Sequence, residues 1–280
     1  MNVENQEQTA LQKLSLGRMI WPILLGLGAA GWLFHSQFDP AEFRAIEWDW
    51  RIFGWIGLAL IFLILRHLCY SNRMRLLGGG HFSWRKAIEL ICIWEFSANL
   101  TPTSKGGPFV MLFVLNKEKL PPAKTASAIL YTVICDSLFF ITLFPVLVTF
   151  FGPPMIQPGM THFDMSSFWG NAFFVAYFAM ASYGLTFFYF LFIRPQHAAG
   201  VFRFLGKLPF LNKKRDSLQK LATDFTLAAT ELKSRPRSFH LGVILSTIGA
   251  WTCKFILLNC LIVAFVPDTP IDGSTQLFLF

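Results

Sequence analysis

The sequence predicts an all-α fold, a polytopic transmembrane helix bundle that includes one re-entrant helix pair. The first observation is composition: 54% of the 280 residues are hydrophobic and only 14% are charged, too little charge to cover a soluble domain of this length. The second is that several apolar runs approach or exceed the roughly 20 residues that span a bilayer. The third is a polar, turn-rich stretch, Ser97–Pro108, that lies between two short apolar runs.

The net charge of +8 fits this membrane class, because the cytoplasmic loops of membrane proteins collect Lys and Arg. No recognition module for nucleic acid accompanies the charge, so we expect no nucleic-acid partner. The five cysteines lie in or beside apolar segments without a CxxC spacing, which favours reduced, packed thiols. The six histidines are scattered along the chain. We therefore predict neither a metal site nor a cofactor.

The first elements set the expected orientation of the chain. Residues 1–18 form a polar arm, and residues 19–34 form the first predicted span, which we expect to be retained because no small-residue cleavage site follows it. An acidic loop separates this span from the second, residues 52–68. A basic cluster ends and follows the second span: Arg66, Arg73, Arg75, Arg85 and Lys86. The positive-inside rule then predicts a cytoplasmic N-terminus and a cytoplasmic basic cluster.

Two short apolar pieces flank the polar stretch. Residues 87–100 and residues 109–115 are both shorter than an ordinary span, and basic residues stand on either side of the pair. The pattern predicts a re-entrant pair that enters and leaves on the cytoplasmic side, with the Thr101–Gly107 loop at its tip. The alternative is two ordinary short spans with the loop outside, because two crossings also return the chain to the cytoplasm.

Three further apolar runs are long enough to span a bilayer: residues 127–151, 168–193 and 241–266. The loop 152–167 is rich in Pro and Gly and has no Lys or Arg, so we expect it outside. The loop 194–240 is strongly basic, so we expect it in the cytoplasm. The chain stops at Phe280 as another apolar run begins, and we expect the sequence to be truncated inside that next span.

Within the basic loop, residues 216–232 have the spacing of a helix. One face of that helix is apolar: Leu218, Leu221, Phe225, Ala228 and Leu232. Charged side chains occupy the opposite face, which predicts an amphipathic helix lying on the membrane surface. The small side chain of Ala228 weakens the apolar face, so a helix packed on other loops is the alternative.

Charged side chains inside apolar runs are candidate functional residues, because each costs about 2.5–3.5 kcal/mol at the centre of a span on insertion scales. Asp136 and Lys254 lie within predicted spans. Glu95 lies on the first re-entrant helix, with Asn99 one turn later on the same face. We predict that these groups converge on a hydrated cavity. The alternative is that Asp136–Lys254 and Glu95–Lys105 are internal ion pairs that only fix packing.

The re-entrant loop itself offers an anion site. Lys105 directly precedes Gly106 and Gly107, where a short helix is expected to begin. The free N–H groups at a helix start, together with an ammonium group, bind anions such as a lipid phosphate. Glycine also allows the backbone to approach such a group closely. These three residues, with Asn99 positioning the loop and Asp136 balancing the charge, form the predicted substrate-binding set together with Glu95 and Lys254.

The sequence shows no constellation for hydrolysis or group transfer. It lacks a Ser-His-Asp set with supporting context, an HExxH motif, a P-loop, and an acidic cluster for a metal-bound sugar nucleotide. We therefore predict no catalytic residue, and an enzyme is the less favoured class.

One stretch of the chain carries an ordered series of motifs. It reads Asn99-Leu-Thr-Pro-Thr-Ser-Lys-Gly-Gly-Pro-Phe, then Leu115-Asn-Lys, then Ala126-Ser-Ala-Ile-Leu, and then Asp136. This series resembles the transmembrane region of lysylphosphatidylglycerol synthases, which belongs to a wider family of flippase-like membrane proteins. Members tend to show an Asn-x-x-Pro turn, a Gly-Gly or Gly-Glu pair, a basic residue after a short helix, and an Asp in the next span.

The resemblance implies a single flippase-like domain over residues 19–280 in the inner (plasma) membrane. It also implies re-entrant helices and a role in moving polar lipids, such as aminoacylated phospholipids or polyisoprenyl-linked sugars. The chain departs from the family where Pro108 replaces a frequent acidic residue, and where Tyr131–Cys135 lacks the frequent Arg before the Asp. No soluble aminoacyl-transferase domain is present in the sequence, so lysyl transfer is not expected.

The sequence as a whole predicts a protein that binds or translocates a polar or anionic lipid, aminoacylated or polyprenyl-linked. Its expected partners are membrane phospholipids or lipid-linked substrates, with a homo-oligomer or a soluble enzyme as further partners. Two other classes remain open: a membrane enzyme that acts on lipid carriers, and a non-catalytic subunit that scaffolds a soluble partner through the loop 194–240.

Overall fold

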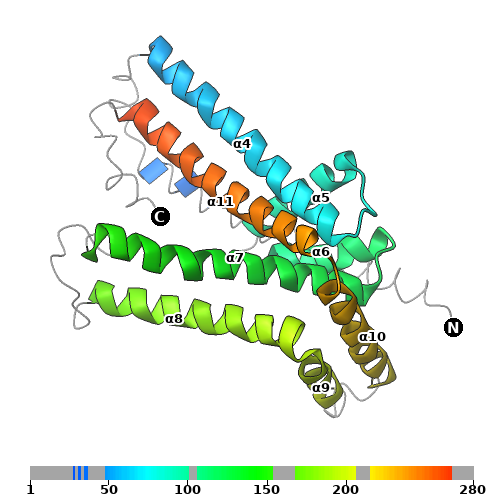
Figure 1. Cartoon of the computed structure of the whole chain (residues 1–280). Coiled ribbons are helices and arrows are strands. Elements are labelled where there is room, and N and C mark those ends of the chain that lie inside the picture. The colour runs from blue at the N-terminus through cyan, green and yellow to red at the C-terminus, as the bar shows by residue number, and fades with distance from the viewer. Residues whose placement is uncertain are drawn as a thin grey trace. The chain divides into compact units, whose positions relative to one another are not determined.

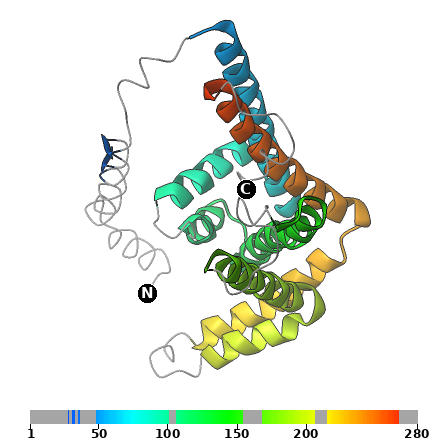
Figure 2. The same ribbon diagram turned by 90° about the vertical axis from the view of Figure 1, so that its left-hand side faces the viewer.

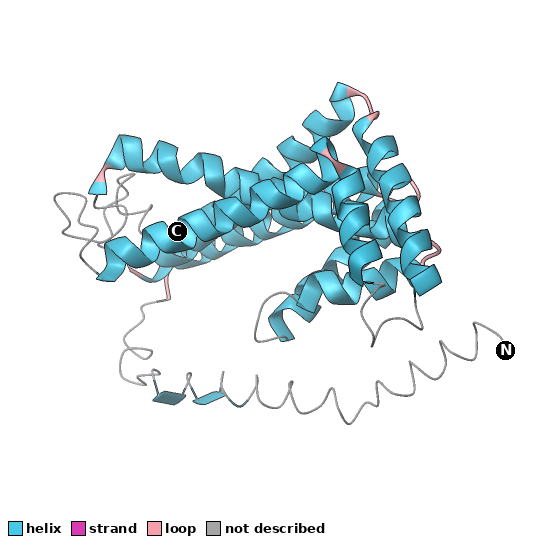
Figure 3. Ribbon diagram, turned by 90° about the horizontal axis from the view of Figure 1, so that it is seen from below, coloured by secondary structure: helices cyan, strands magenta, loops and turns pink. Residues whose placement is uncertain are grey.

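The computed structural model describes residues 28, 31–32, 35–36, 48–100, 106–153, 168–205 and 215–266. Helices make up all the secondary structure in these ranges, as Figure 3 shows. The first predicted span, residues 19–34, lies almost entirely outside them. Contacts divide the chain into a smaller unit, residues 1–48 with 92–111, and a larger unit, residues 49–91 with 112–280.

Four helices among the described residues are long and apolar enough to cross a membrane. They are α4 (Trp50–Leu77), α7 (Pro122–Phe151), α8 (Phe168–Phe188) with its π-helical continuation η2 (Tyr189–Ile193), and α11 (Arg237–Phe265). At 1.5 Å per residue, even the 28-residue α4 is about 42 Å long, more than the hydrocarbon thickness of a bilayer. The predicted polytopic helix bundle is confirmed, and α4 continues nine residues beyond the predicted span.

Helices α4 and α11 run antiparallel and lie side by side in two perpendicular views (Figures 1 and 2). Small residues of α11 face α4: a Cβ added at Gly242 would lie 3.1 Å from the Cδ1 of Leu76. One turn further on, Asn72 donates a hydrogen bond to the hydroxyl of Ser246 at 2.9 Å. Gly249 continues the stripe. Stripes of small residues let two helix backbones approach closely inside a membrane.

Helices α7 and α8 form a second antiparallel pair (Figure 1). The two helices come close at Gly184, where an added Cβ would lie 2.5 Å from the Cβ of Ser137. The hydroxyl of Tyr177 donates to the backbone carbonyl of Ile141 at 3.1 Å. Only glycine fits at position 184 without a shift of α7, so this contact sets the separation of the two helices.

A hydrophobic core lies where α7 and α11 begin and where α8 ends. It also includes side chains of α9 (Pro195–Leu205) and α10 (Arg215–Lys233). The hydroxyl of Tyr131 lies 2.6 Å from the Nδ1 of His240, which ties α7 to α11 beside this core. The buried members of the core are Tyr131, Ile134, Cys135, Leu191, Ala198, Phe225, Ala229, Leu232 and Val243.

Helix α10 corrects one sequence-based expectation. Phe225, Ala228 and Leu232, on the predicted apolar face, are buried, and α10 packs against α9 and α7. Protein therefore covers the buried part of the face that we predicted to lie on the membrane. The alternative, a helix packed on other loops, holds for the contact with α9, which lies in the same loop, whereas α7 is one of the long helices. The small Ala228 and Ala229 side chains favour this outcome, because they permit close contact between helices rather than deep insertion into lipid.

Helix α8 ends in the π-helical turn η2. The N–H of Arg194 donates to the carbonyl of Tyr189, five residues back, at 2.9 Å. Such a turn holds one more residue than an α-helical turn. Within it, Leu191 is fully buried in the core. Helix α9 then begins at Pro195, where a missing backbone N–H does no harm.

Two short helices, α5 (Trp84–Leu100) and α6 (Gly106–Lys117), flank the polar stretch. Their 17 and 12 residues give lengths of about 26 Å and 18 Å, both below the bilayer's hydrocarbon thickness. Their re-entrant course stays a prediction.

Helix α5 ends at Leu100 and helix α6 begins at Gly106, as predicted for the two pieces on either side of the Thr101–Gly107 loop. The hydroxyl of Ser97 donates to the carbonyl of Ile93 at 2.6 Å, which satisfies this polar side chain within the helix. Residues 101–105 lie outside the described part.

Polar contacts join the end of α4, the start of α5 and the end of α6. We call this end of the larger unit the basic end. Arg75 of α4 donates to the carbonyl of Phe82 at 3.2 Å, and the Nε2 of His81 lies 3.0 Å from the carbonyl of Glu118. Lys86 of α5 pairs with Glu118 at 2.7 Å and with Glu89 at 3.2 Å. Hydrogen bonds to these two carboxylates, Glu118 first, raise the pKa of the Lys86 ammonium.

Candidate intramembrane ion-pair site

The carboxylate of Asp136 lies among three of the long helices. Arg73 of α4 donates from Nη1 to its Oδ1 at 2.6 Å and from Nη2 to its Oδ2 at 3.4 Å. The indole N–H of Trp251, on α11, donates to the same Oδ1 at 3.0 Å. Because Asp136 is on α7, its one side chain joins α4, α7 and α11. We call Arg73, Asp136 and Trp251 the intramembrane cluster.

Arg73 is the most buried charge in this cluster, with 7% of its side chain exposed against 28% for Asp136. Its Nη1 also donates to the hydroxyl of Thr247 at 3.1 Å. The guanidinium carbon lies 4.9 Å from the ring centroid of Tyr70, which presents its π-face to the cation. Both terminal nitrogens of Arg73 therefore have hydrogen-bond partners, and the carboxylate is the more exposed part of the ion pair.

Trp251 connects this cluster to Lys254. The ammonium of Lys254 lies 4.5 Å from the centroid of the Trp251 ring system, a cation–π distance, while the indole N–H bonds Asp136. Phe140 packs edge-on against the indole, with ring centroids 4.6 Å apart. The alternative of a direct Asp136–Lys254 ion pair is therefore wrong: Arg73 is the cationic partner of Asp136, and Trp251 stands between Asp136 and Lys254.

An apolar groove of about 380 Å³ lies between α7 and α11, beside the cluster. Two of its lining residues touch or adjoin the ion pair: Thr247 accepts a hydrogen bond from Arg73, and Cys135 precedes Asp136. The rest of the lining is nearly all hydrocarbon: Leu138, Phe139, Thr142, Leu143, Val146, Ile244 and Ile248. The arrangement is amphiphilic, because the charged cluster adjoins the apolar groove at Cys135 and Thr247.

The family model of the lysylphosphatidylglycerol synthase TM region matches residues 19–280 of this chain. The chain belongs to this family. The match includes the four long helices, the short pair α5 and α6, and each member of the intramembrane cluster. A comparison with curated proteins and with solved structures finds no match.

The site residues predicted for this family member fall into both units of the fold. Glu95 and Asn99 lie one turn apart near the end of α5, and Gly106 and Gly107 begin α6; all four belong to the smaller unit. Asp136 and Lys254 belong to the larger unit, and both contact Trp251. Lys105 lies outside the described residues. The convergence of the two groups on one cavity stays a prediction.

Sequence reasoning missed Arg73 as a site residue of this lysylphosphatidylglycerol synthase-type domain. The residue was grouped with a cytoplasmic basic cluster, because hydropathy falls at Arg66 and the predicted span ended at residue 68. One signal was available: no Gly or Pro interrupts the chain between Leu58 and Leu77, and the helix ends at the glycine turn that begins with Gly78. A continuous helix carries Arg73 along the face that meets α11, toward Thr247.

Proposed function

We propose that this domain binds and translocates lipids with a polar, charged headgroup across the inner membrane. The observation that carries the proposal is the intramembrane cluster beside the apolar groove of α7 and α11. In this proposal the headgroup meets the charged residues while an acyl chain occupies the groove. Ionisable groups inside membrane spans are costly, and such groups commonly mark the pathway of a polar substrate.

The chemistry of the cluster suits a headgroup with both signs of charge. Asp136 is the more exposed partner, and its Oδ2 is held only by a 3.4 Å contact, so an ammonium group of a lipid headgroup has an acceptor there. Arg73 offers a guanidinium that recognises phosphate as well as carboxylate. A lysylated phosphatidylglycerol, the lipid in the family's name, carries an ammonium and a phosphate of this kind.

The polar stretch between α5 and α6 supplies the second half of the proposed pathway. Helix α6 begins at Gly106, so the N–H groups of its first turn have no acceptor within the helix. In our proposal Lys105 and the amides of Gly106 and Gly107 hold the lipid phosphate, Asn99 positions the loop, and Glu95 meets a cationic group. The prediction that α5 and α6 are re-entrant belongs to the same proposal.

We also propose that the basic end faces the cytoplasm. Cationic side chains gather there from α4, α5, α7 and the turn before α11, as Arg75, Lys86, Lys124 and Arg235 illustrate. The positive-inside rule predicts cytoplasmic placement for such an end. A cytoplasmic N-terminus follows if residues 19–34 cross the membrane once.

Lipid translocation in proteoliposomes tests the proposal. The chain would be reconstituted with fluorescent phosphatidylglycerol, an aminoacylated phosphatidylglycerol or a polyprenyl phosphate, and the rate of inward or outward movement would be measured. We expect the wild type to move one of these lipids, and Asp136→Asn and Lys105→Ala to slow that movement at least tenfold.

Asp224→Asn is the matched control, because it removes an exposed carboxylate of α10 outside the cluster. Size-exclusion chromatography of each purified variant checks that it is folded. A wild type that moves none of the three lipids, or an Asp136→Asn variant that matches it, would contradict the proposal and favour an enzyme or a scaffold.

A further inference from the structure

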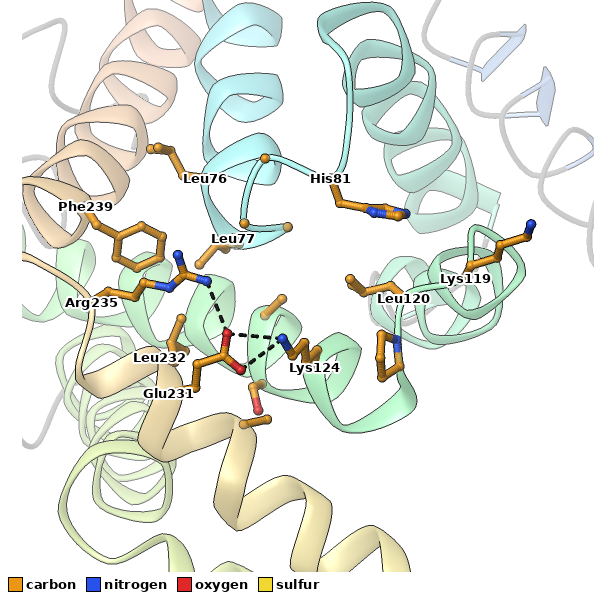
Figure 4. A pocket seen from close by; sticks show the side chains of 17 residues that line it. Leu76, Leu77, His81, Lys119, Leu120, Lys124, Glu231, Leu232, Arg235 and Phe239 are labelled. Atoms are coloured by element: carbon orange, nitrogen blue, oxygen red, sulfur yellow. Dashed lines mark hydrogen bonds and ion pairs between the residues drawn. The ribbon is translucent and has the colours of Figure 1, made fainter.

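A second cavity, of about 410 Å³, lies at the basic end, away from the intramembrane cluster. The end of α4 with the turn Gly78–Gly80, the start of α7, and the chain between α10 and α11 form its walls (Figure 4). None of its lining residues belongs to the intramembrane cluster or lines the apolar groove, although some of them lie on the same helices. Cavities of this size accommodate small ligands or lipid headgroups.

Two cations and one carboxylate face each other in this cavity. Lys124 lies 2.9 Å from one oxygen of Glu231 and 3.1 Å from the other. Arg235 approaches the second oxygen at 3.2 Å. Figure 4 shows both cations pointing at this carboxylate from different sides. The bond from Lys124, with the charge of Arg235, lowers the pKa of Glu231, so the carboxylate is ionised at neutral pH.

The side chains of this trio are accessible to solvent, with 48%, 43% and 41% of Lys124, Glu231 and Arg235 exposed. Ion pairs with that much water around them contribute little to stability. Another anion that enters the cavity can therefore take over the two cations at low cost. Lys124 and Glu231 also line a neighbouring cavity of about 420 Å³, so the pair stands between two hollows.

The glycine turn Gly78–Gly80 forms part of the cavity wall. The N–H of Gly80 donates to the carbonyl of Arg75, and the N–H of Gly79 donates to the carbonyl of Leu76. This pair of hydrogen bonds ends a helix in a Schellman motif. Gly79 has φ +64, and a Cβ there would lie 3.3 Å from the Nη2 of Arg235. A side chain in this turn would thus crowd the guanidinium.

The opposite turn repeats the motif with a lysine. The N–H of Leu120 donates to the carbonyl of Leu115 and that of Lys119 to the carbonyl of Asn116. Lys119 has φ 62, a left-handed conformation that usually selects glycine. A cationic residue thus occupies a strained position on the rim of the cavity, beside His81 (Figure 4).

The remaining wall of the cavity is apolar. Leu76, Leu77, Leu232 and Phe239 line it, and the guanidinium carbon of Arg235 lies 5.9 Å from the ring centroid of Phe239. Charged and hydrocarbon surfaces therefore meet in one cavity at the end of the membrane-spanning helices. That combination suits a ligand with an anionic group that is esterified to an apolar chain.

We infer that this cavity binds a phosphate group, whose oxygens replace the Glu231 carboxylate between Lys124 and Arg235. The phosphate belongs either to the headgroup of an anionic lipid or to a small phosphorylated solute. Glu231 then acts as an internal competitor that occupies the two cations when the cavity is empty. The inference does not depend on the proposed translocation, because it uses none of the residues assigned to that pathway.

Isothermal titration calorimetry of the purified chain in an uncharged maltoside detergent tests this inference. The probes are dihexanoyl-phosphatidylglycerol and inorganic phosphate. We expect Lys124→Ala and Arg235→Ala each to weaken binding about tenfold, because each removes a charge-assisted hydrogen bond. We expect Glu231→Gln to tighten binding about tenfold, because it removes the competing carboxylate but keeps the shape of the side chain.

Lys233→Ala is the matched control, since it removes an exposed cation from the same helix without touching the cavity. Tighter binding of the lipid than of inorganic phosphate assigns the site to a headgroup, and equal binding assigns it to a soluble phosphate. Absence of binding overturns the inference, as does binding that Lys124→Ala leaves unchanged. Weaker binding by Glu231→Gln also overturns it, because that result would make the ion pair a structural support.

Discussion

The two charged clusters of the larger unit differ in how much water surrounds them. Arg73 and Asp136 meet at 2.6 Å with 7% and 28% of their side chains exposed, whereas Lys124 and Glu231 meet at 2.9 Å with more than 40% exposed. Similar distances thus conceal different energetics, because a charge that loses its partner can be hydrated at the second cluster but not at the first. Loss of a partner should therefore cost the fold more at the first cluster than at the second.

The largest effect is expected at the buried cluster. Asp136→Ala should lower the free energy of unfolding by about 3–5 kcal/mol, because it leaves the guanidinium of Arg73 buried without its counter-charge. Denaturant or thermal unfolding of the purified protein in detergent measures this loss. A loss below about 1 kcal/mol would remove the contrast between the two clusters.

A double variant separates the structural from the functional role of the same pair. Arg73→Met with Asp136→Leu removes both charges and fills the space with hydrocarbon, which often restores stability. We expect this variant to unfold near the wild type and yet to fail in the proteoliposome assay. Full translocation by the double variant would mean that the charges serve the fold alone.

The second-largest loss of stability is expected at an uncharged contact of the same bundle, between α7 and α8. Gly184→Ala should cost about 1–3 kcal/mol, because its Cβ would lie 2.5 Å from the Cβ of Ser137 and force α7 and α8 apart. Gly57→Ala is the control, since nothing lies within 4 Å of the added Cβ and alanine favours the helix. Equal unfolding midpoints for the two variants would show that α7 and α8 separate without cost.

The third substitution is expected to raise stability. Lys119→Gly should raise the free energy of unfolding by about 0.5–1 kcal/mol, because glycine adopts the left-handed conformation of this turn without a Cβ clash. Lys117→Gly, two residues earlier at the last residue of α6, should instead lower it, by less than about 1 kcal/mol. A loss of stability in Lys119→Gly would mean that the lysine side chain stabilises the turn itself.

The smallest effect is expected from the exposed trio and depends on pH. The pKa of Glu231 is lowered in the folded protein, so its contribution is present at neutral pH and is lost as the pH falls below about 4.5. The exposure of the pair limits that contribution to about 0.2–1 kcal/mol. Unfolding curves of the wild type and Glu231→Gln should therefore converge as the pH drops from 6 to 3, and curves that stay apart would contradict this assignment.

Hydropathy was enough to predict the long helices, because lipid-facing spans must be apolar along most of their length. The predicted spans 127–151, 168–193 and 241–266 agree with the observed helices to within about five residues. Hydropathy failed where α4 leaves the apolar region, since arginines such as Arg66 and Arg73 continue a helix about as readily as leucine does. The helix ends where the glycine turn Gly78–Gly80 takes left-handed backbone angles at Gly79 and Gly80.

The candidate site was half predictable for a related reason. Asp136 and Lys254 stood out because a charge in an apolar run needs an explanation, but their partners are set by three-dimensional packing. Arg73 precedes Asp136 by 63 residues, and nothing local in the sequence links them. Trp251 was the accessible clue, because it lies one helical turn before Lys254, where an indole can face the ammonium.

The π-helical turn at the end of α8 has a consequence for how relatives align. A turn of this kind holds one residue more than its α-helical equivalent, and it arises most simply by a single-residue insertion. Family members with an uninterrupted α-helix here should be one residue shorter between Gly184 and Pro195. An alignment that ignores this gap would put the buried Leu191 opposite a residue about 100° away around the helix, and would mistake a core position for a lipid-facing one.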